Sequence, residues 1–252
     1  MAPGAGDRTT LTVDEWLVRL RVEGERLGEV AAATALDAAV PGCPGWDVDA
    51  LVRHMGDVHR WAGTIVRDRV QERVRLDSVG PDDRDGLLAW YRDGHRQLLD
   101  ALSSATPDAR FWAWGEAPSP LAFWARRQAH ETAIHRLDVE QAAGLSQTPF
   151  PVRAATDGID EWLLLAPARC RVTGGSGGSL SIAPSDVQDR WLVGLRTERI
   201  TVERDGAQGE CSVRAPASDL FALLMNRRGV DGIGVDGDAE VLQTWRESMR
   251  FV

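Results

Sequence analysis

The chain has 252 residues, enough to bury a sizeable core as one large domain or as two ordinary ones. Its net charge of -9 argues against a nucleic acid as the main partner, because a polyanion requires a basic surface. No apolar run approaches the roughly 18–20 residues that span a bilayer, and the N-terminus lacks the basic and apolar regions of a signal peptide. We therefore expect a cytoplasmic protein with no membrane partner. A monomer or weak dimer is expected, although no sequence feature determines the oligomeric state.

The first 145 residues or so predict four long amphipathic helices. Thr12 and Glu15 have the spacing of a capping box at the start of the first helix. Asp47 is a good N-cap for a second helix that runs to about Arg69. A third helix is expected over 85–103, and a fourth begins at Ser119-Pro120 and ends at Gly144.

After about Pro149 the pattern changes to that of a smaller α+β domain. A short helix is expected over 152–165, followed by a flexible glycine–serine run over 174–179. Period-two segments then predict strands at 179–183, 190–195, 199–203 and 210–214, with a further short strand at 232–235 and helices after Pro216 and over 238–249. Asp205-Gly206 predicts a hairpin between the third and fourth strands. The predicted organisation is a helical domain at 1–148 and, at 149–252, an α+β domain with an antiparallel sheet.

Three residues on two of the predicted helices form a candidate metal site. Glu131 and His135 are four apart on the fourth helix, so their side chains lie on one face. His54 borders the apolar stripe of the second helix. Two imidazoles and a carboxylate make a three-ligand site for a divalent metal with one position open, as a catalytic site requires.

Each half of this candidate site also has an ordinary structural explanation. A Glu and a His four apart often form a surface pair, and a histidine beside an apolar stripe is often a satisfied core residue. The other three histidines, His59, His95 and His130, point away from the proposed site or pack against a neighbouring helix. Asp138 follows His135 by three residues, so it could orient that imidazole or be an exposed partner of it.

The chain offers no convincing nucleophile of its own. All 29 basic residues are arginine, which excludes Schiff-base chemistry and a Walker-type phosphate loop. The sequence contains no GxSxG, HExxH or GxGxxG motif. The three cysteines predict no disulfide framework, and Cys43 lies in a proline–glycine turn where a structural role is favoured. A reactive group supplied by a bound small molecule is therefore expected, and a thiol that a metal deprotonates is a good candidate.

Two stretches resemble the signatures of the mycothiol-dependent maleylpyruvate isomerase family. They are VPGCPGWDVDALVRHMGDVHRW at 40–61 and RRQAHETAIHRLD at 126–138. The resemblance implies a DinB-like, up-down four-helix bundle followed by a smaller domain similar to sterol carrier proteins. Mycothiol belongs to actinobacteria, whose GC-rich genomes agree with the absence of lysine.

The resemblance also implies roles for particular residues. The family's metal ligands correspond to His54, Glu131 and His135, and the metal it implies is zinc. The stretch at 219–228 resembles a helix of the family's second domain, so Arg227 or Arg228 could hold an anionic group of the substrate.

The sequence as a whole predicts a metal-dependent enzyme that uses mycothiol to attack an electrophilic small molecule, as an isomerase or an S-transferase. Two alternatives stay open: a metal-dependent hydrolase that activates water at the same site, and a non-catalytic protein that binds a small molecule.

Overall fold

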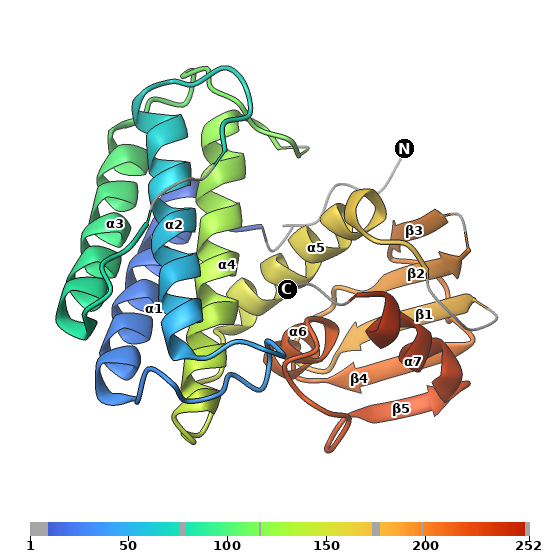
Figure 1. The fold of residues 1–252 in the computed structure, drawn as a ribbon. Helices are drawn as coiled ribbons and strands as arrows, with labels where there is room; N and C mark the ends of the chain where they lie inside the picture. Colours follow the sequence, from blue (N-terminus) through green and yellow to red (C-terminus); the bar gives the residue numbers. More distant parts are fainter. Residues whose placement is uncertain (1–9, 76–78, 116, 173–176, 198, 250–252) are drawn as a thin grey trace. The chain divides into compact units, whose positions relative to one another are not determined.

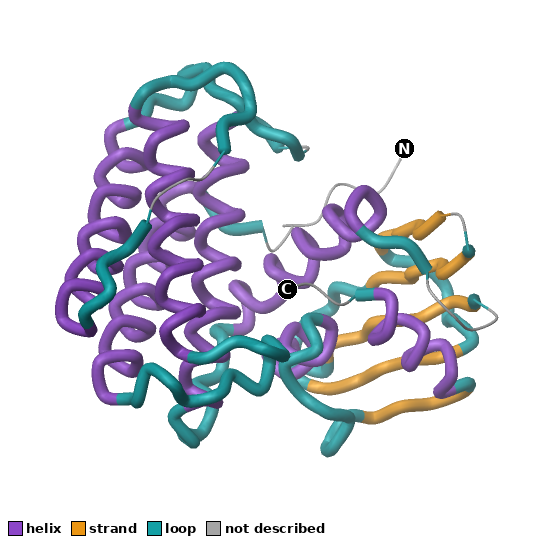
Figure 2. The backbone as a smooth tube through the Cα atoms, in the orientation of Figure 1, coloured by secondary structure: helices purple, strands orange, loops and turns teal. Residues whose placement is uncertain are grey.

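The computed structural model describes residues 10–75, 79–115, 117–172, 177–197 and 199–249. The chain divides into two compact units after Thr148. The helical unit is Thr12–Thr148, and the sheet unit is formed by the rest of the described chain, including Thr10 and Leu11. The strands in Figure 2 all belong to the sheet unit. Among the described residues, no helix is both long and apolar enough to cross a membrane.

Four long helices make up the helical unit (Figure 1): α1 Val13–Ala33, α2 Val48–Arg67, α3 Arg84–Ser104 and α4 Pro120–Ala142. Thr12 and Glu15 form the predicted capping box at the start of α1. Asp47 caps α2 and Ser119 caps α4, because the side-chain oxygen of each accepts a hydrogen bond from a first-turn N–H. Gly144 lies just beyond α4 with φ 66°, the left-handed conformation that ends many helices. The predicted local signals at these three helices are confirmed.

The helices pack α1 against α4 and α2 against α3, with further contacts between α1 and α3 and between α2 and α4. Their core is built from buried apolar side chains of all four helices, among them Leu27, Leu51, Met55, Leu87, Leu88, Tyr91 and Val139. Burying an aliphatic or aromatic side chain of this size stabilises the folded state by about 1.5–3 kcal/mol. A Cβ atom at Gly24 would lie 2.2 Å from His95 Nε2, so this glycine allows α1 to approach α3 closely.

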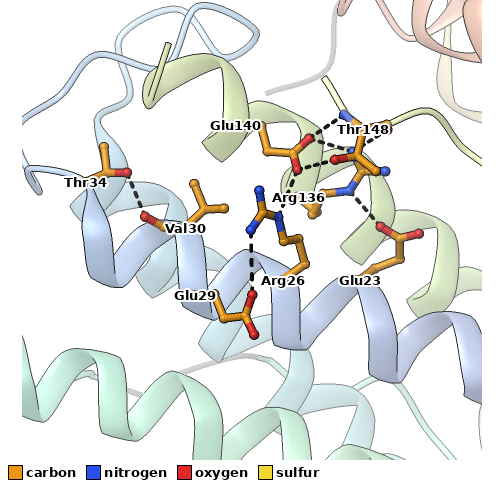
Figure 3. Close-up of polar contacts among 8 residues, drawn as sticks. All are labelled: Glu23, Arg26, Glu29, Val30, Thr34, Arg136, Glu140 and Thr148. Atoms are coloured by element: carbon orange, nitrogen blue, oxygen red, sulfur yellow. Dashed lines mark hydrogen bonds and ion pairs between the residues drawn. The ribbon is translucent and has the colours of Figure 1, made fainter. Parts of the chain in front are cut away.

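A buried ion network joins α1 to the end of α4 (Figure 3). The Arg136 side chain is 1% exposed, and its guanidinium contacts Glu23 at 2.7 Å, Glu140 at 2.8 Å and the Thr148 carbonyl at 2.7 Å. Glu140 also accepts hydrogen bonds from Arg26, at 3.2 Å, and from the backbone and hydroxyl of Thr148. Buried charges persist only when they are paired and hydrogen-bonded. The network therefore fixes α4, which carries two of the predicted metal ligands, against α1.

Five strands form one mixed sheet in the order β3-β2-β1-β4-β5. Their bounds are β1 Gly178–Pro184, β2 Trp191–Arg196, β3 Arg199–Arg204, β4 Cys211–Ala215 and β5 Gly234–Gly237. Three of the pairs are antiparallel, but β1 and β4 run parallel, with Leu180 opposite Cys211. The prediction of an antiparallel sheet is wrong at this pair, because β4 enters the sheet by a crossover.

The predicted hairpin at Asp205-Gly206 is also wrong. Asp205 has φ 56°, so the chain does turn there, and its N–H donates to the Arg190 carbonyl at 2.9 Å. The chain then crosses to the opposite edge of β1, where the Gly209 N–H donates to Ser181 Oγ at 2.8 Å. Turn residues identify a change of direction, but they do not determine which strand the chain joins next.

Three helices, α5 Val152–Arg169, α6 Ala217–Leu224 and α7 Ala239–Ser248, pack against the sheet. The side chains of the strands alternate, and those of the covered face are buried, including Leu180, Ile182, Val193, Leu195 and Val213. Phe221 packs close to Gly158 between α5 and α6, and Trp245 Nε1 donates to the Leu224 carbonyl between α7 and α6. The α5 helix continues four residues past its predicted end at Leu165. Residues 174–176 of the predicted glycine–serine run lie outside the described residues.

Candidate metal centre

The structure brings His54 of α2 together with Glu131 and His135 of α4. Glu131 Oε1 lies 3.6 Å from His54 Nε2 and 3.5 Å from His135 Nε2, and the three donor atoms lie within 4.8 Å of one another. These two separations exceed ordinary hydrogen-bond lengths. They match the edges of a tetrahedron with metal–ligand bonds of roughly 2.0–2.1 Å, which are about 3.3–3.5 Å long. The donor set and its spacing therefore fit a divalent metal ion such as zinc.

The loop before α2 places an aromatic ring against both imidazoles. Backbone bonds between Val40 and Trp46 close the proline–glycine turn that the sequence predicts. The Trp46 ring lies 4.9 Å from the His54 ring, edge to face, and 6.1 Å from the His135 ring, nearly parallel to it. Trp46 therefore restricts the orientations of both imidazoles.

A buried carboxylate lies behind His135. Asp138 Oδ2 is 2.9 Å from His135 Nδ1, an ion-pair contact, and it accepts a hydrogen bond from the Cys43 thiol at 3.4 Å. Burial disfavours a charged imidazole, but Asp138, Cys43 and Glu131 raise the pKa of His135 well above its usual value. A carboxylate in this place fixes the ring so that Nε2 faces the other donors. Cys43 is buried, as a structural role requires, and its partner is the side chain that contacts His135.

Glu131 is held from its other side by an arginine one helical turn earlier. Arg127 Nη2 lies 2.5 Å from Glu131 Oε2, the oxygen that is not directed at the imidazoles. Burial by itself would raise the pKa of Glu131, but Arg127 and the two histidines hold it well below its ordinary value. The carboxylate is therefore ionised, as a metal ligand must be.

A family model described as the mycothiol maleylpyruvate isomerase N-terminal domain matches residues 17–140. Residues 17–140 of the chain belong to the mycothiol maleylpyruvate isomerase N-terminal domain family. Two solved structures of the mycothiol-dependent maleylpyruvate isomerase are similar, a histidine-to-alanine mutant with a TM-score of 0.63 and another structure with a TM-score of 0.60. Each of these structures is 15% identical in sequence to this chain. The match covers 90% of this chain and 93% of the chain in the solved structure, so the likeness shows a common fold. No curated protein matches the chain by sequence.

The resemblance stated from the sequence is confirmed by these comparisons. The stretches 40–61 and 126–138 both lie inside the matched region of the mycothiol maleylpyruvate isomerase domain. All three candidate ligands, His54, Glu131 and His135, come from these two stretches.

The other three histidines of the chain lie away from these converging donors. His59 Nε2 and Thr132 Oγ1 share a hydrogen bond of 2.9 Å in the core, and His95 Nε2 lies 3.0 Å from the Leu20 carbonyl. His130, although next to Glu131, is not among the converging donors. The prediction that these three residues do not belong to the candidate site agrees with this arrangement.

The two candidate substrate arginines belong to the sheet unit. Arg228 forms an ion pair with Asp219 and donates to the Asp231 carbonyl at 2.6 Å. Arg227 is buried, and its guanidinium donates to the Met225 carbonyl at 2.9 Å. Both guanidiniums thus have protein partners, and their role toward a substrate stays a prediction.

Arg127 was missed by the sequence analysis. Its only sequence signal is the spacing of four residues to Glu131, which places the two side chains on the same face of α4. Because helices commonly carry such pairs at their surface, the spacing alone does not separate a pair in a functional site from an ordinary one.

Proposed function

We propose that the protein is a divalent-metal-dependent enzyme that uses a low-molecular-weight thiol, mycothiol, to attack an electrophilic small molecule. The reaction is that of a thiol-dependent isomerase, like the maleylpyruvate isomerase, or that of an S-transferase. The observation that carries this proposal is the convergence of two imidazoles and one carboxylate at metal-ligand spacing, in a chain of this family. The proposal takes the helical unit as a DinB-like four-helix bundle and the sheet unit as similar to sterol carrier proteins.

Each residue of the site has a physical task in this proposal. His54, Glu131 and His135 hold the ion, and their nitrogen and oxygen donors suit zinc. An ion bound there supplies a Lewis acid that favours the deprotonated form of a thiol at neutral pH. Asp138 keeps His135 Nε2 directed at the other donors, and Trp46 packs against the His135 ring.

The side-chain exposure agrees with a site that a small molecule can reach. The side chains of His54 and Glu131 are 33% and 27% exposed, whereas that of His135 is 9% exposed. With three protein donors, a zinc site retains a position for an external ligand. Arg227 or Arg228 is proposed to hold an anionic group of the electrophile.

A hydrolase is the second candidate, because the same donor set favours it. Two histidines and one glutamate hold zinc in several hydrolytic enzymes, where the open position takes water. The thiol reaction is preferred because of the family, and the two candidates differ in whether a thiol binds.

Two measurements test the proposal. Metal analysis of the purified protein is expected to find about one equivalent of divalent ion, lost in His54→Ala and in Glu131→Gln. Glu29→Gln serves as the control: Glu29 is an exposed carboxylate of α1, so this variant is expected to retain the metal. Calorimetric titration with mycothiol is then expected to show binding to the metal-loaded protein and none to His54→Ala.

The outcomes distinguish the candidates. Metal binding without any thiol binding at millimolar mycothiol contradicts the thiol reaction and favours the hydrolase. A purified protein that contains no divalent metal contradicts both candidates and leaves a non-catalytic binding protein.

A further inference from the structure

The two oxygens of Glu131 face different partners. Oε1 is directed at the imidazoles of His54 and His135, at 3.6 and 3.5 Å. Oε2 is 2.5 Å from Arg127 Nη2. The carboxylate is thus divided between the candidate metal centre and one guanidinium.

Burial distinguishes this pair from an ordinary helix pair. Glu–Arg pairs at a spacing of four residues usually lie at the surface, where solvent screens them. The Arg127 side chain is only 7% exposed, whereas the carboxylate it contacts is 27% exposed. Burying a guanidinium is unfavourable unless it is paired. Stabilisation of α4 alone does not explain a buried cation beside a candidate metal ligand.

We propose that Arg127 is a positioning residue that keeps Glu131 a single-oxygen donor and so preserves the site for an external anionic ligand. This inference rests on the proposed metal site. A carboxylate can bind a cation through one oxygen or through both. The guanidinium engages Oε2 and leaves Oε1 to face the two imidazoles.

The charge of Arg127 has a second effect. It offsets the negative charge of Glu131, so the site as a whole is more positive than its donors alone would make it. A more positive site attracts a thiolate more strongly than a neutral ligand. Arg127 therefore acts on the affinity for the external ligand more than on the affinity for the ion.

The test compares Arg127→Met and Arg127→Lys with Arg126→Met. Arg126 is the neighbouring arginine, and its guanidinium lies 6.0 Å from the Trp16 ring rather than at the site. Two affinities are measured for each variant: that of the metal-free protein for zinc, by competition with a chelator, and that of the zinc-loaded protein for mycothiol, by calorimetry.

The expected result is a split between the two affinities. In Arg127→Met the mycothiol affinity falls by about tenfold or more, because a positive charge beside the thiolate is lost, while zinc affinity is unchanged or higher. Arg127→Lys keeps the charge without the planar fork, so it recovers part of the mycothiol affinity. Arg126→Met resembles the unmodified protein in both.

An infrared measurement on the unmodified protein guards against a variant that does not fold. The difference spectrum between zinc-loaded and metal-free protein, with the glutamate carboxylates labelled with carbon-13 so that their bands can be identified, is expected to show the wide carboxylate splitting of a single-oxygen donor. The inference is overturned if the splitting is that of a two-oxygen donor, if Arg127→Met binds mycothiol normally, or if both affinities fall together. Failure of the unmodified protein to bind zinc or mycothiol contradicts the proposed function instead.

Discussion

Replacing Arg136 by methionine tests whether the buried ion network holds α4 against α1. The substitution keeps most of the aliphatic volume and removes a guanidinium that is 1% exposed. Glu23, with 8% of its side chain exposed, then loses its contact at 2.7 Å, whereas Glu140 retains Arg26 and Thr148. Removing one partner of a buried ion pair costs about 3–5 kcal/mol. We expect the free energy of unfolding of the helical unit to fall by that amount, most of it because of Glu23.

A double substitution and a control make the magnitude specific. Adding Glu23→Gln to Arg136→Met removes the unpaired charge, so it is expected to restore about 2 kcal/mol. Arg26→Met is the control: its side chain is 42% exposed, and such pairs contribute about 1 kcal/mol or less. Urea dependence of hydrogen exchange at the amides of α1 and α4 reports this unit separately. An Arg136→Met protein as stable as Arg26→Met, or a double variant whose two losses simply add, would refute the reasoning.

Three further substitutions have defined outcomes. Asp138→Asn is expected to weaken zinc binding by about 10–100-fold in a chelator competition, and unchanged binding would show that this carboxylate does not orient its neighbour. Burial lowers the pKa of both His59 and His95, so below about pH 6.5 the unfolded chain takes up protons that the folded chain does not. The free energy of unfolding of the metal-free protein therefore decreases as the pH is lowered, by up to about 1.4 kcal/mol per pH unit for each histidine. Urea denaturation between pH 6.5 and 5 should show a weaker dependence of this free energy on pH in His59→Gln. An equal dependence in the variant and the unmodified protein contradicts the account. Gly24→Ala places a Cβ 2.2 Å from His95 Nε2 and is expected to lower the free energy of unfolding by about 1–3 kcal/mol, as measured by urea denaturation. Gly229→Ala is the control, because a Cβ at that position meets nothing within 4 Å. Equal stability of the two variants would count against close packing at Gly24.

The features that the sequence predicts well depend on neighbours within one helix. Thr12, Asp47 and Ser119 cap their helices because a side-chain oxygen and a first-turn N–H are three residues apart, whatever the rest of the fold does. The shared face of Glu131 and His135 follows from the helical repeat in the same way.

Features that depend on distant segments were missed or wrong. The Cys43 thiol and the Asp138 carboxylate are 95 positions apart, so their hydrogen bond follows only from the packing of the loop before α2 against α4. The crossover from β3 to β4 was predicted as a hairpin, because Asp205-Gly206 encodes a turn but not the parallel pairing of β4 with β1. Only the three-dimensional structure shows that Arg127 contacts Oε2 of Glu131 and not Oε1.

The most direct test of the proposed function uses cobalt in place of zinc. Cobalt(II) takes similar ligands, and a thiolate bound to it gives an intense sulfur-to-metal charge-transfer absorption. Titrating the cobalt-loaded protein with mycothiol is predicted to produce this absorption, saturating at one thiol per chain, and His54→Ala is predicted to abolish it. A cobalt-loaded protein whose spectrum does not change at millimolar mycothiol would contradict the claim that this site activates a thiol.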